Sequence, residues 1–226
     1  MPSLLTLDVE QRARVAAYWW QRAEGEITSW VGFQHVLADL RAEGSPEAVV
    51  ALAERAVEDE YRHALFCRDW AAHFGRVERD LPTPRSTDPI TFRGATTDEN
   101  RLLRIALCCL TETVGCFILR QVRPQLIDLE LRRLNRRHLA DELRHSRVGW
   151  GHLASLSEDK KATLRRWLPA LLRVSEHTCC SGPEEDHEEL VPFGYFTPRV
   201  LRAAYNQALA EVIQPGLAHL GFTEPS

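Results

Sequence analysis

The chain contains two short segments of nearly the same sequence, DEYRHA and DELRHS. In each segment a glutamate precedes a histidine by three residues, which gives the pairs Glu60 with His63 and Glu142 with His145. Residues three apart on an α-helix project from the same face, so each pair can bind one cation. Carboxylate and imidazole groups together suit iron or manganese. The repeated segments therefore indicate a metal site built from two helices.

Two further glutamates, Glu26 and Glu112, each interrupt an apolar stripe that has helical spacing. Four carboxylates in a dry core would be strongly destabilising unless their charge were neutralised. Two divalent cations would neutralise four negative charges, so we predict that the four glutamates share a two-metal site. Glu24 lies on a second stripe of the same helix and is the alternative ligand, but the stripe that contains Glu26 is longer and more apolar.

Helical patterns cover almost the whole chain, and they indicate which elements hold these side chains. The expected helices span residues 8–41, 46–74, 98–123, 128–156, 158–176 and 198–215. Short turns join the first helix to the second and the third to the fourth, so each pair is antiparallel. The linker at 76–97, about 22 residues long, can cross more than one bundle length. The pattern predicts an all-α four-helix bundle with one long crossover.

The predicted ligands also lie at matching heights in this bundle. Glu26 lies 18 residues before the turn at Gly44, and Glu60 lies 16 residues after it. Glu112 and Glu142 are placed almost symmetrically about the second turn. Because each hairpin folds back on itself, the two glutamates of each pair come to similar levels along the bundle axis.

The order Glu, E-x-x-H, Glu, E-x-x-H resembles that of the ferritin-like di-iron carboxylate proteins, over residues 10–156 of this chain. The resemblance implies a ferritin-like bundle that holds two iron ions, with manganese or a mixed manganese–iron pair as the alternative. It assigns as metal ligands Glu26, Glu60, His63, Glu112, Glu142 and His145. It also implies that Asp59 accepts a hydrogen bond from His145 across the bundle, and Asp141 one from His63.

His138 lies four residues before Glu142 and seven before His145, on the inward stripe of the fourth helix. The spacing H-x-x-x-E-x-x-H resembles the arylamine N-oxygenases of the p-aminobenzoate N-oxygenase type, in which an extra histidine binds one iron. The resemblance implies that His138 is a seventh metal ligand. A buried, hydrogen-bonded histidine without a metal is the alternative interpretation.

The sequence divides into a four-helix region at 1–156 and a C-terminal region at 157–226. We expect the first to form the metal-binding bundle and the second to be a helical extension packed on it. The C-terminal region contains no motif with a recognisable chemistry. A run of arginines at 132–137 is interpreted as a solvated face or a contact for an acidic partner.

The function expected from the resemblance is that of a non-haem di-iron oxygenase. Such an enzyme uses O2 to oxygenate a small organic substrate, for example an amine in biosynthesis. A ferritin- or rubrerythrin-like ferroxidase or peroxidase is the alternative, and a non-catalytic helical module is the third possibility. Because the chain shows no redox motif such as C-x-x-C, we expect a reductase or another external electron donor to supply electrons. A homodimer is the expected assembly.

Composition limits the other partners. The formal net charge is −4, which argues against a nucleic-acid partner. We expect no apolar stretch to be long enough to span a membrane, and the N-terminal residues do not resemble a secretory signal. The six cysteines show no metal or disulfide spacing, so we expect reduced thiols and a cytoplasmic location.

Overall fold

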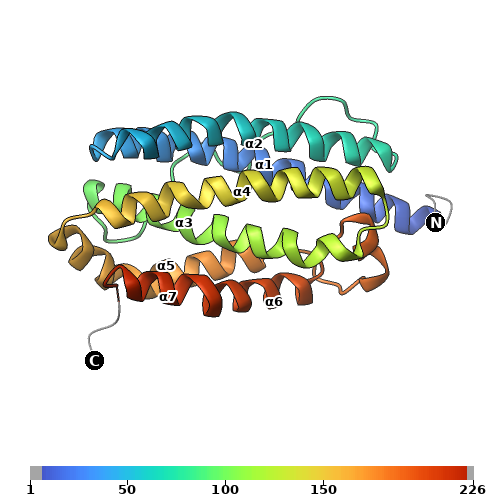
Figure 1. Cartoon of the computed structure of the whole chain (residues 1–226). Coiled ribbons are helices and arrows are strands. Elements are labelled where there is room, and N and C mark those ends of the chain that lie inside the picture. Colours follow the sequence, from blue (N-terminus) through green and yellow to red (C-terminus); the bar gives the residue numbers. More distant parts are fainter. Residues whose placement is uncertain (1–6, 223–226) are drawn as a thin grey trace.

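The computed structural model describes residues 7–222, and these residues form helices and connecting loops without any strand. The first six residues, which belong to the N-terminal segment expected not to be a secretory signal, lie outside the described range. Seven α-helices follow one another along the chain (Figure 1): α1 Val9–Ala42, α2 Glu47–His73, α3 Thr97–Val122, α4 Leu129–Ser155, α5 Glu158–Cys180, α6 Pro198–Ala208 and α7 Gln214–His219. The predicted all-α class is confirmed.

The helix boundaries follow from capping groups in the sequence. Helix α1 begins with a capping box, because Asp8 accepts a hydrogen bond from the Gln11 amide and the Gln11 side chain accepts one from the Asp8 amide. Serine is a favoured capping residue, but Ser45 does not cap α2. Pro46 is the capping residue, and the Ser45 hydroxyl instead lies 2.8 Å from Nδ1 of His152 on α4.

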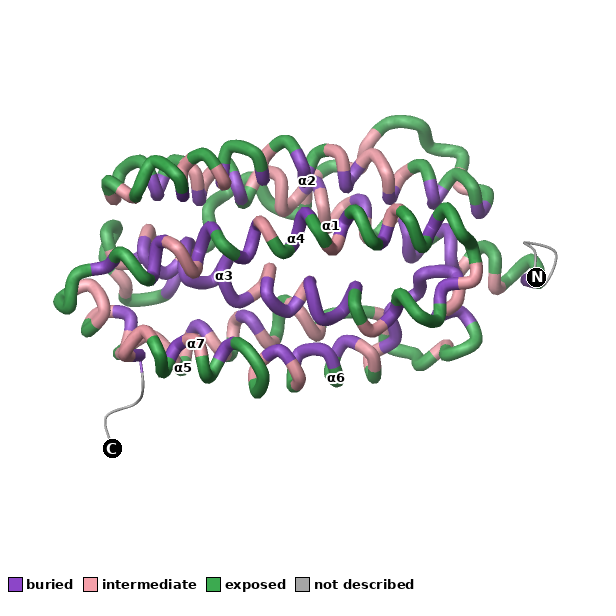
Figure 2. The backbone as a smooth tube through the Cα atoms, in the orientation of Figure 1, coloured by how far each residue is buried: buried purple, intermediate pink, exposed green. Residues whose placement is uncertain are grey.

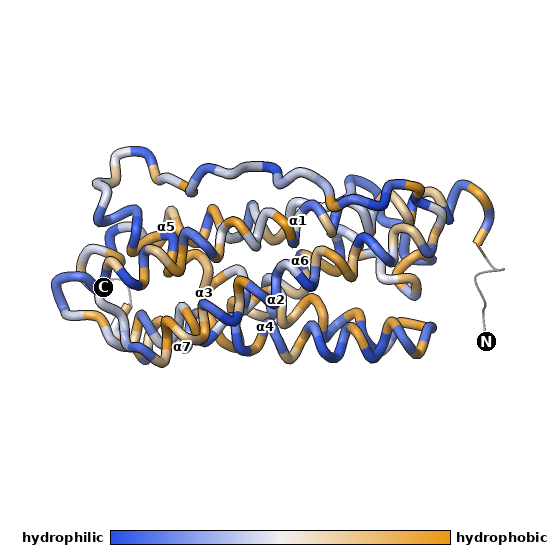
Figure 3. The backbone as a smooth tube through the Cα atoms, turned by 90° about the horizontal axis from the view of Figure 1, so that it is seen from above, coloured by the Kyte–Doolittle hydropathy of each residue, from blue (hydrophilic) through white to orange (hydrophobic). Residues whose placement is uncertain are grey.

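Four long helices form two antiparallel hairpins, α1 with α2 and α3 with α4 (Figure 1). Helices α2 and α3 run in the same direction, so the connection at residues 74–96 returns along the length of the bundle. This connection is fixed to α1, since the Arg85 amide donates a hydrogen bond to Thr28 Oγ1 at 2.9 Å. Figure 3 shows the connection along one side of the helices.

Helices α3 and α4, the two members of the second hairpin, approach each other's backbones closely around Gly149 of α4. A Cβ atom added there would lie only 2.2 Å from the Cβ of Cys109 on α3. A glycine is therefore needed at this helix crossing, which lies one turn beyond His145 on α4. The close approach fixes the relative position of two helices that carry predicted ligands.

The C-terminal helices pack on the side of the bundle formed by α3, which contacts both α5 and α6. The single helix expected at 198–215 is divided by a π-helical turn, Leu209–Ile213, between α6 and α7. The apolar residues just before α6 form the 3-10 turn Glu188–Phe193. Figure 2 shows that buried residues line α3 along its length.

Helix α3 departs from the expectation that no segment is apolar enough to span a membrane. Among the described residues, the segment Thr97–Gln125 meets the length and hydropathy requirements, with a mean hydropathy of 1.9 over its best window. Within the fold, 78% of that window is buried. The apolarity of α3 has a structural explanation, because this helix lies between α4 and the C-terminal helices.

Candidate metal centre

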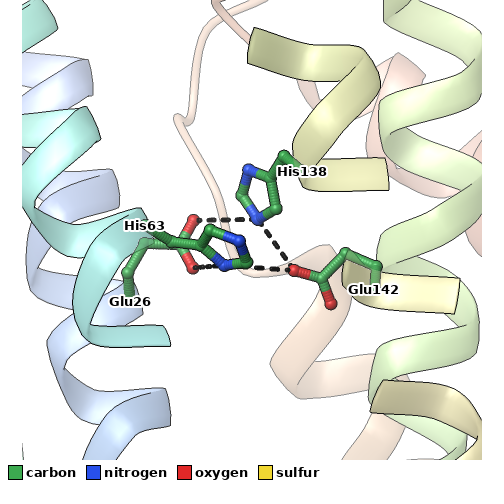
Figure 4. Close-up of side chains that lie close together, drawn as sticks. All are labelled: Glu26, His63, His138 and Glu142. Carbon is green, nitrogen blue, oxygen red and sulfur yellow. Dashed lines mark ion pairs between the residues drawn. The ribbon is translucent and has the colours of Figure 1, made fainter. Parts of the chain in front are cut away.

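The structure brings all seven predicted metal ligands together in the middle of the bundle. They form two clusters, and the candidate ligand atoms of each cluster lie within 4.8 Å of one another. Cluster A consists of Glu26, His63, His138 and Glu142, and cluster B consists of Glu60, Glu112, Glu142 and His145. Figure 4 shows cluster A, in which the side chains from α1, α2 and α4 point toward a common centre. Glu142 belongs to both clusters.

Glu142 and Glu60 are each oriented toward both clusters. Oε1 of Glu142 lies 3.6 Å from Nδ1 of His63, and its Oε2 lies 3.6 Å from Nδ1 of His145. Oε1 of Glu60 lies 2.8 Å from Nδ1 of His145, and its Oε2 lies 3.9 Å from Nδ1 of His63. Each carboxylate thus directs one oxygen to each histidine, which is the arrangement that two bridging carboxylates require.

The two E-x-x-H histidines are held in a fixed orientation by aspartates from the opposite helix. Nε2 of His63 lies 3.1 Å from Asp141, and Nε2 of His145 lies 3.4 Å from Asp59. With an N–H directed at each aspartate, the Nδ1 atoms face the clusters. Both Nδ1 atoms are buried and have no hydrogen-bond partner among the described residues. Imidazole nitrogens left in this way are suited to bind a metal ion.

His138 projects into cluster A, on the side of His63. Its Nε2 lies 2.7 Å from Oε1 of Glu142 and 3.8 Å from Oε1 of Glu26. Its ring stacks on that of His63, with the centroids 3.8 Å apart. Burial, together with the neighbouring His63 and Arg22, holds the pKa of His138 well below its usual value. A neutral imidazole directed at two carboxylates is a suitable metal ligand.

The structure also distinguishes the two candidate glutamates of α1. Glu26 belongs to cluster A, whereas Glu24 points outward and forms an ion pair with Arg85 at 2.9 Å. The exposed fraction of the Glu24 side chain is 38%, against 15% for Glu26. Glu26 is therefore the α1 residue placed to bind a metal.

The repeated arginines form a ring of ion pairs with the aspartates. Arg62 lies 2.7 Å from both Asp59 and Asp141, and Arg144 also hydrogen-bonds to both. Burial would raise the pKa of each aspartate, but hydrogen bonds from a ligand histidine and from Arg62 lower it below the usual range. The ring therefore keeps both aspartates ionised. The repeat of D-E-x-R-H in the sequence was the signal for it.

Two carboxyl groups and two histidines of the clusters have raised pKa values. Burial first, and neighbouring carboxylates second, raise the pKa of Glu26 to about 8 and that of Glu112 to about 8. Burial alone would lower the pKa of His63, but the hydrogen bond to Asp141 and the neighbouring Glu60 carboxylate outweigh it and raise the pKa to about 10. The pKa of His145 is raised for similar reasons. These protons reduce the net negative charge of the clusters, as bound metal cations would do.

A cavity of about 480 Å³ adjoins the two clusters. Its lining includes five predicted ligands: Glu26, Glu60, Glu112, His138 and Glu142. Apolar side chains such as Phe33, Leu107 and Ile118 make up much of the remaining wall. Residues from the crossover and from α5 and α6 contribute as well, so the C-terminal region helps to enclose the cavity. A volume of this size is in the range of small-molecule sites.

Three arginines line the cavity, and one of them, Arg22, lies beside a predicted ligand, a position that sequence analysis missed. Its guanidinium is stacked between the rings of Trp19 and Phe196, at 4.4 Å from each ring centroid. It lies 3.7 Å from Oε1 of Glu26. The only signal in the sequence was its position one helical turn before Glu26, since Phe196 comes from a distant segment.

The donor set fits a pair of metal ions. Four carboxylates and three imidazoles converge, and once their protons are released the four negative charges would balance two divalent cations. No protein-family model, no curated protein and no solved structure matches the chain. The case for a metal centre therefore stands on the geometry of the two clusters, which can hold metal ions.

Proposed function

We propose that the chain is a ferritin-like di-iron oxygenase that uses O2 to oxygenate a small organic substrate, such as an amine. The observation that carries this proposal is the cavity of about 480 Å³ whose wall includes five of the seven predicted ligands. A substrate in that cavity would lie directly against the metal ions. A centre devoted to storing iron has no need of a largely apolar chamber of this size.

The side chains of the chain have separate roles in this proposal. Glu26 and Glu112 would each bind one metal ion, and Glu60 and Glu142 would bridge the two. Bound iron supplies O2 activation, which protein side chains alone cannot perform. One oxygen atom enters the substrate and the other becomes water, so each turnover consumes two electrons and two protons. An external donor supplies the electrons, and manganese or a mixed pair is the alternative metal content.

The surrounding protein orients these ligands and limits access of water. The aspartate–arginine ring fixes the two histidine rings, which keeps their Nδ1 atoms directed inward. The apolar wall of the cavity excludes water around the reacting atoms, and this strengthens electrostatic interactions there. The ferritin-like assignment is supported by the two antiparallel hairpins and by the long connection at residues 74–96.

Anaerobic loading with ferrous iron followed by exposure to O2 separates the proposal from the ferroxidase alternative. We expect iron binding to saturate at two ions per chain, and O2 consumption without substrate to stop after about one turnover. A ferroxidase would instead continue to consume added ferrous iron and O2. Continued uptake far beyond two ions per chain would reject the oxygenase in favour of that alternative.

Substitution of the bridging residues tests the centre itself. Glu60→Ala and Glu142→Ala should each lose bound metal, measured as iron per chain after removal of loosely bound ions. Glu24→Ala is the matched control on α1, because Glu24 pairs with Arg85 outside the clusters. If either bridging variant kept two ions per chain, that residue would not be a ligand.

Activity is tested with primary arylamines and an external reductant under ¹⁸O2. The expected product carries one ¹⁸O atom on the substrate, detected by mass spectrometry. Product that formed equally well with the Glu142→Ala variant would show that the chemistry does not occur at this centre.

A further inference from the structure

The outer face of α4 carries an unusual concentration of unpaired positive charge. Arg133, Arg136, Arg137 and Arg147 are exposed, and none forms an ion pair with another described residue. The only exposed acid on this helix is Glu130, because its other two acids are buried. The chain as a whole has a net charge of −4, so the positive charge of this helix face is opposite in sign to that of the whole chain. We name these four arginines the α4 face.

Exposed apolar residues lie among these arginines. Arg136, Ala140, Leu143 and Arg147 follow one another at helical spacing, so they form a single outward stripe. Leu143 is 50% exposed, a high value for a leucine in the middle of a long helix. The exposed leucine gives this face an apolar contact, beside its positive charges, with which it can bind a partner protein.

The same face leads directly to the metal clusters. Arg144, whose side chain is 29% exposed, hydrogen-bonds to both Asp59 and Asp141. These aspartates contact the two ligand histidines, so the surface is connected to the centre through two side chains. The ligands of α4 lie on its inner side, so the thickness of one helix, about 10–12 Å with side chains, separates them from this surface.

We propose that the α4 face binds an acidic one-electron carrier protein, for which a plant-type [2Fe–2S] ferredoxin is the probe. Only the use of its electrons rests on the proposed oxygenase function. Two reduced carriers each lose one electron, and the two electrons convert two ferric ions into ferrous ions. Opposite charges would steer the encounter and raise the association rate. A second copy of the chain would bring like charges together on this face, which disfavours it as the occupant.

The test reverses the charge of three residues in one variant, Arg133→Glu/Arg136→Glu/Arg147→Glu. None of them contacts a ligand, and Arg144 is left intact because it holds the aspartates. Binding of oxidised plant-type ferredoxin is measured by calorimetry, with metal-free and with iron-loaded protein. We expect binding to weaken at least tenfold in the variant. Binding of the unaltered protein should weaken steeply between 50 and 300 mM salt.

The matched control carries the same change of six charge units elsewhere, as Arg79→Glu/Arg93→Glu/Arg173→Glu. These three arginines are also exposed and form no ion pair with another described residue. The control should bind ferredoxin within about threefold of the unaltered protein. Equal binding by the α4-face variant and the control would overturn the proposal. The proposal would also be overturned if the α4-face variant lost self-association, or if the unaltered protein bound a short DNA duplex more tightly than ferredoxin.

The electron-transfer step is measured by stopped flow, as oxidation of reduced ferredoxin by ferric-loaded protein. The rate should fall at least tenfold in the α4-face variant but not in the control. Dithionite should reduce the iron in all three proteins, which shows that the centre is intact. If none of these three proteins binds iron, the oxygenase proposal fails. The calorimetric result with metal-free protein would still decide whether the α4 face binds the carrier.

Discussion

Loading the metal-free protein with two divalent cations should displace about four protons at pH 7. A carboxyl group with a pKa of about 8, as for Glu26 and Glu112, is about nine-tenths protonated at that pH. His63, with a pKa of about 10, and His145, whose pKa is also raised, each carry a further proton. All four groups must release their protons to bind a metal. The buried centre thus exchanges about four protons for four cationic charges.

Proton release is measured by anaerobic calorimetry in buffers of different ionisation enthalpy. Glu26→Gln should reduce the count by about one proton, because it removes one protonated carboxyl group. Glu24→Gln should leave the count unchanged, since Glu24 lies outside the clusters. Metal affinity should rise as the pH increases from 6 to 8, in which range the carboxyl groups lose their protons. Release of fewer than about two protons would refute the reasoning, as would equal effects of the two variants.

Two further predictions concern stability. Gly149→Ala should lower the free energy of unfolding by about 1–3 kcal/mol, because the added methyl group overpacks against Cys109. Gly32→Ala is the control and should not lower it, since no atom lies near the added methyl group. Urea unfolding measures the free energy of unfolding of both variants. Burial lowers the pKa of His152 to about 4, so stability should decrease as the pH falls from 6.5 toward 4, by at most about 3 kcal/mol. His152→Gln should remove that dependence; equal pH profiles for the two proteins would contradict the assignment.

The helices and the inward direction of the predicted ligands could be predicted because both depend on local periodicity. Each glutamate interrupts an apolar stripe, and the structure places all four at the centre of the bundle. The spacing about the turns was equally informative, since an α-helix rises by a constant amount per residue. The role of Ser45 could not be predicted in this way, because its hydroxyl contacts a residue on α4, and local sequence carries no information about such a contact.

The cavity and Arg22 could not have been predicted from spacing. The cavity wall combines α1 and α3 with the crossover and the C-terminal helices, which are far apart in the sequence. In the sequence Arg22 resembles an ordinary surface arginine, because nothing there indicates that the ring of Phe196 stacks on it. Helix α3 was misjudged for a related reason, because its apolarity reflects packing by neighbours on several sides.

The two D-E-x-R-H segments give the centre an approximate twofold symmetry, and His138 breaks it. The residue at the corresponding place before Glu60 is Ala56, which has no ligand atom. Cluster A therefore offers two nitrogen donors and two carboxylates, whereas cluster B offers one nitrogen donor and three carboxylates. An imidazole ligand suits iron better than manganese, whereas a carboxylate ligand suits manganese well. The two positions should consequently fill in sequence rather than together, and in a mixed-metal protein iron should occupy cluster A and manganese cluster B.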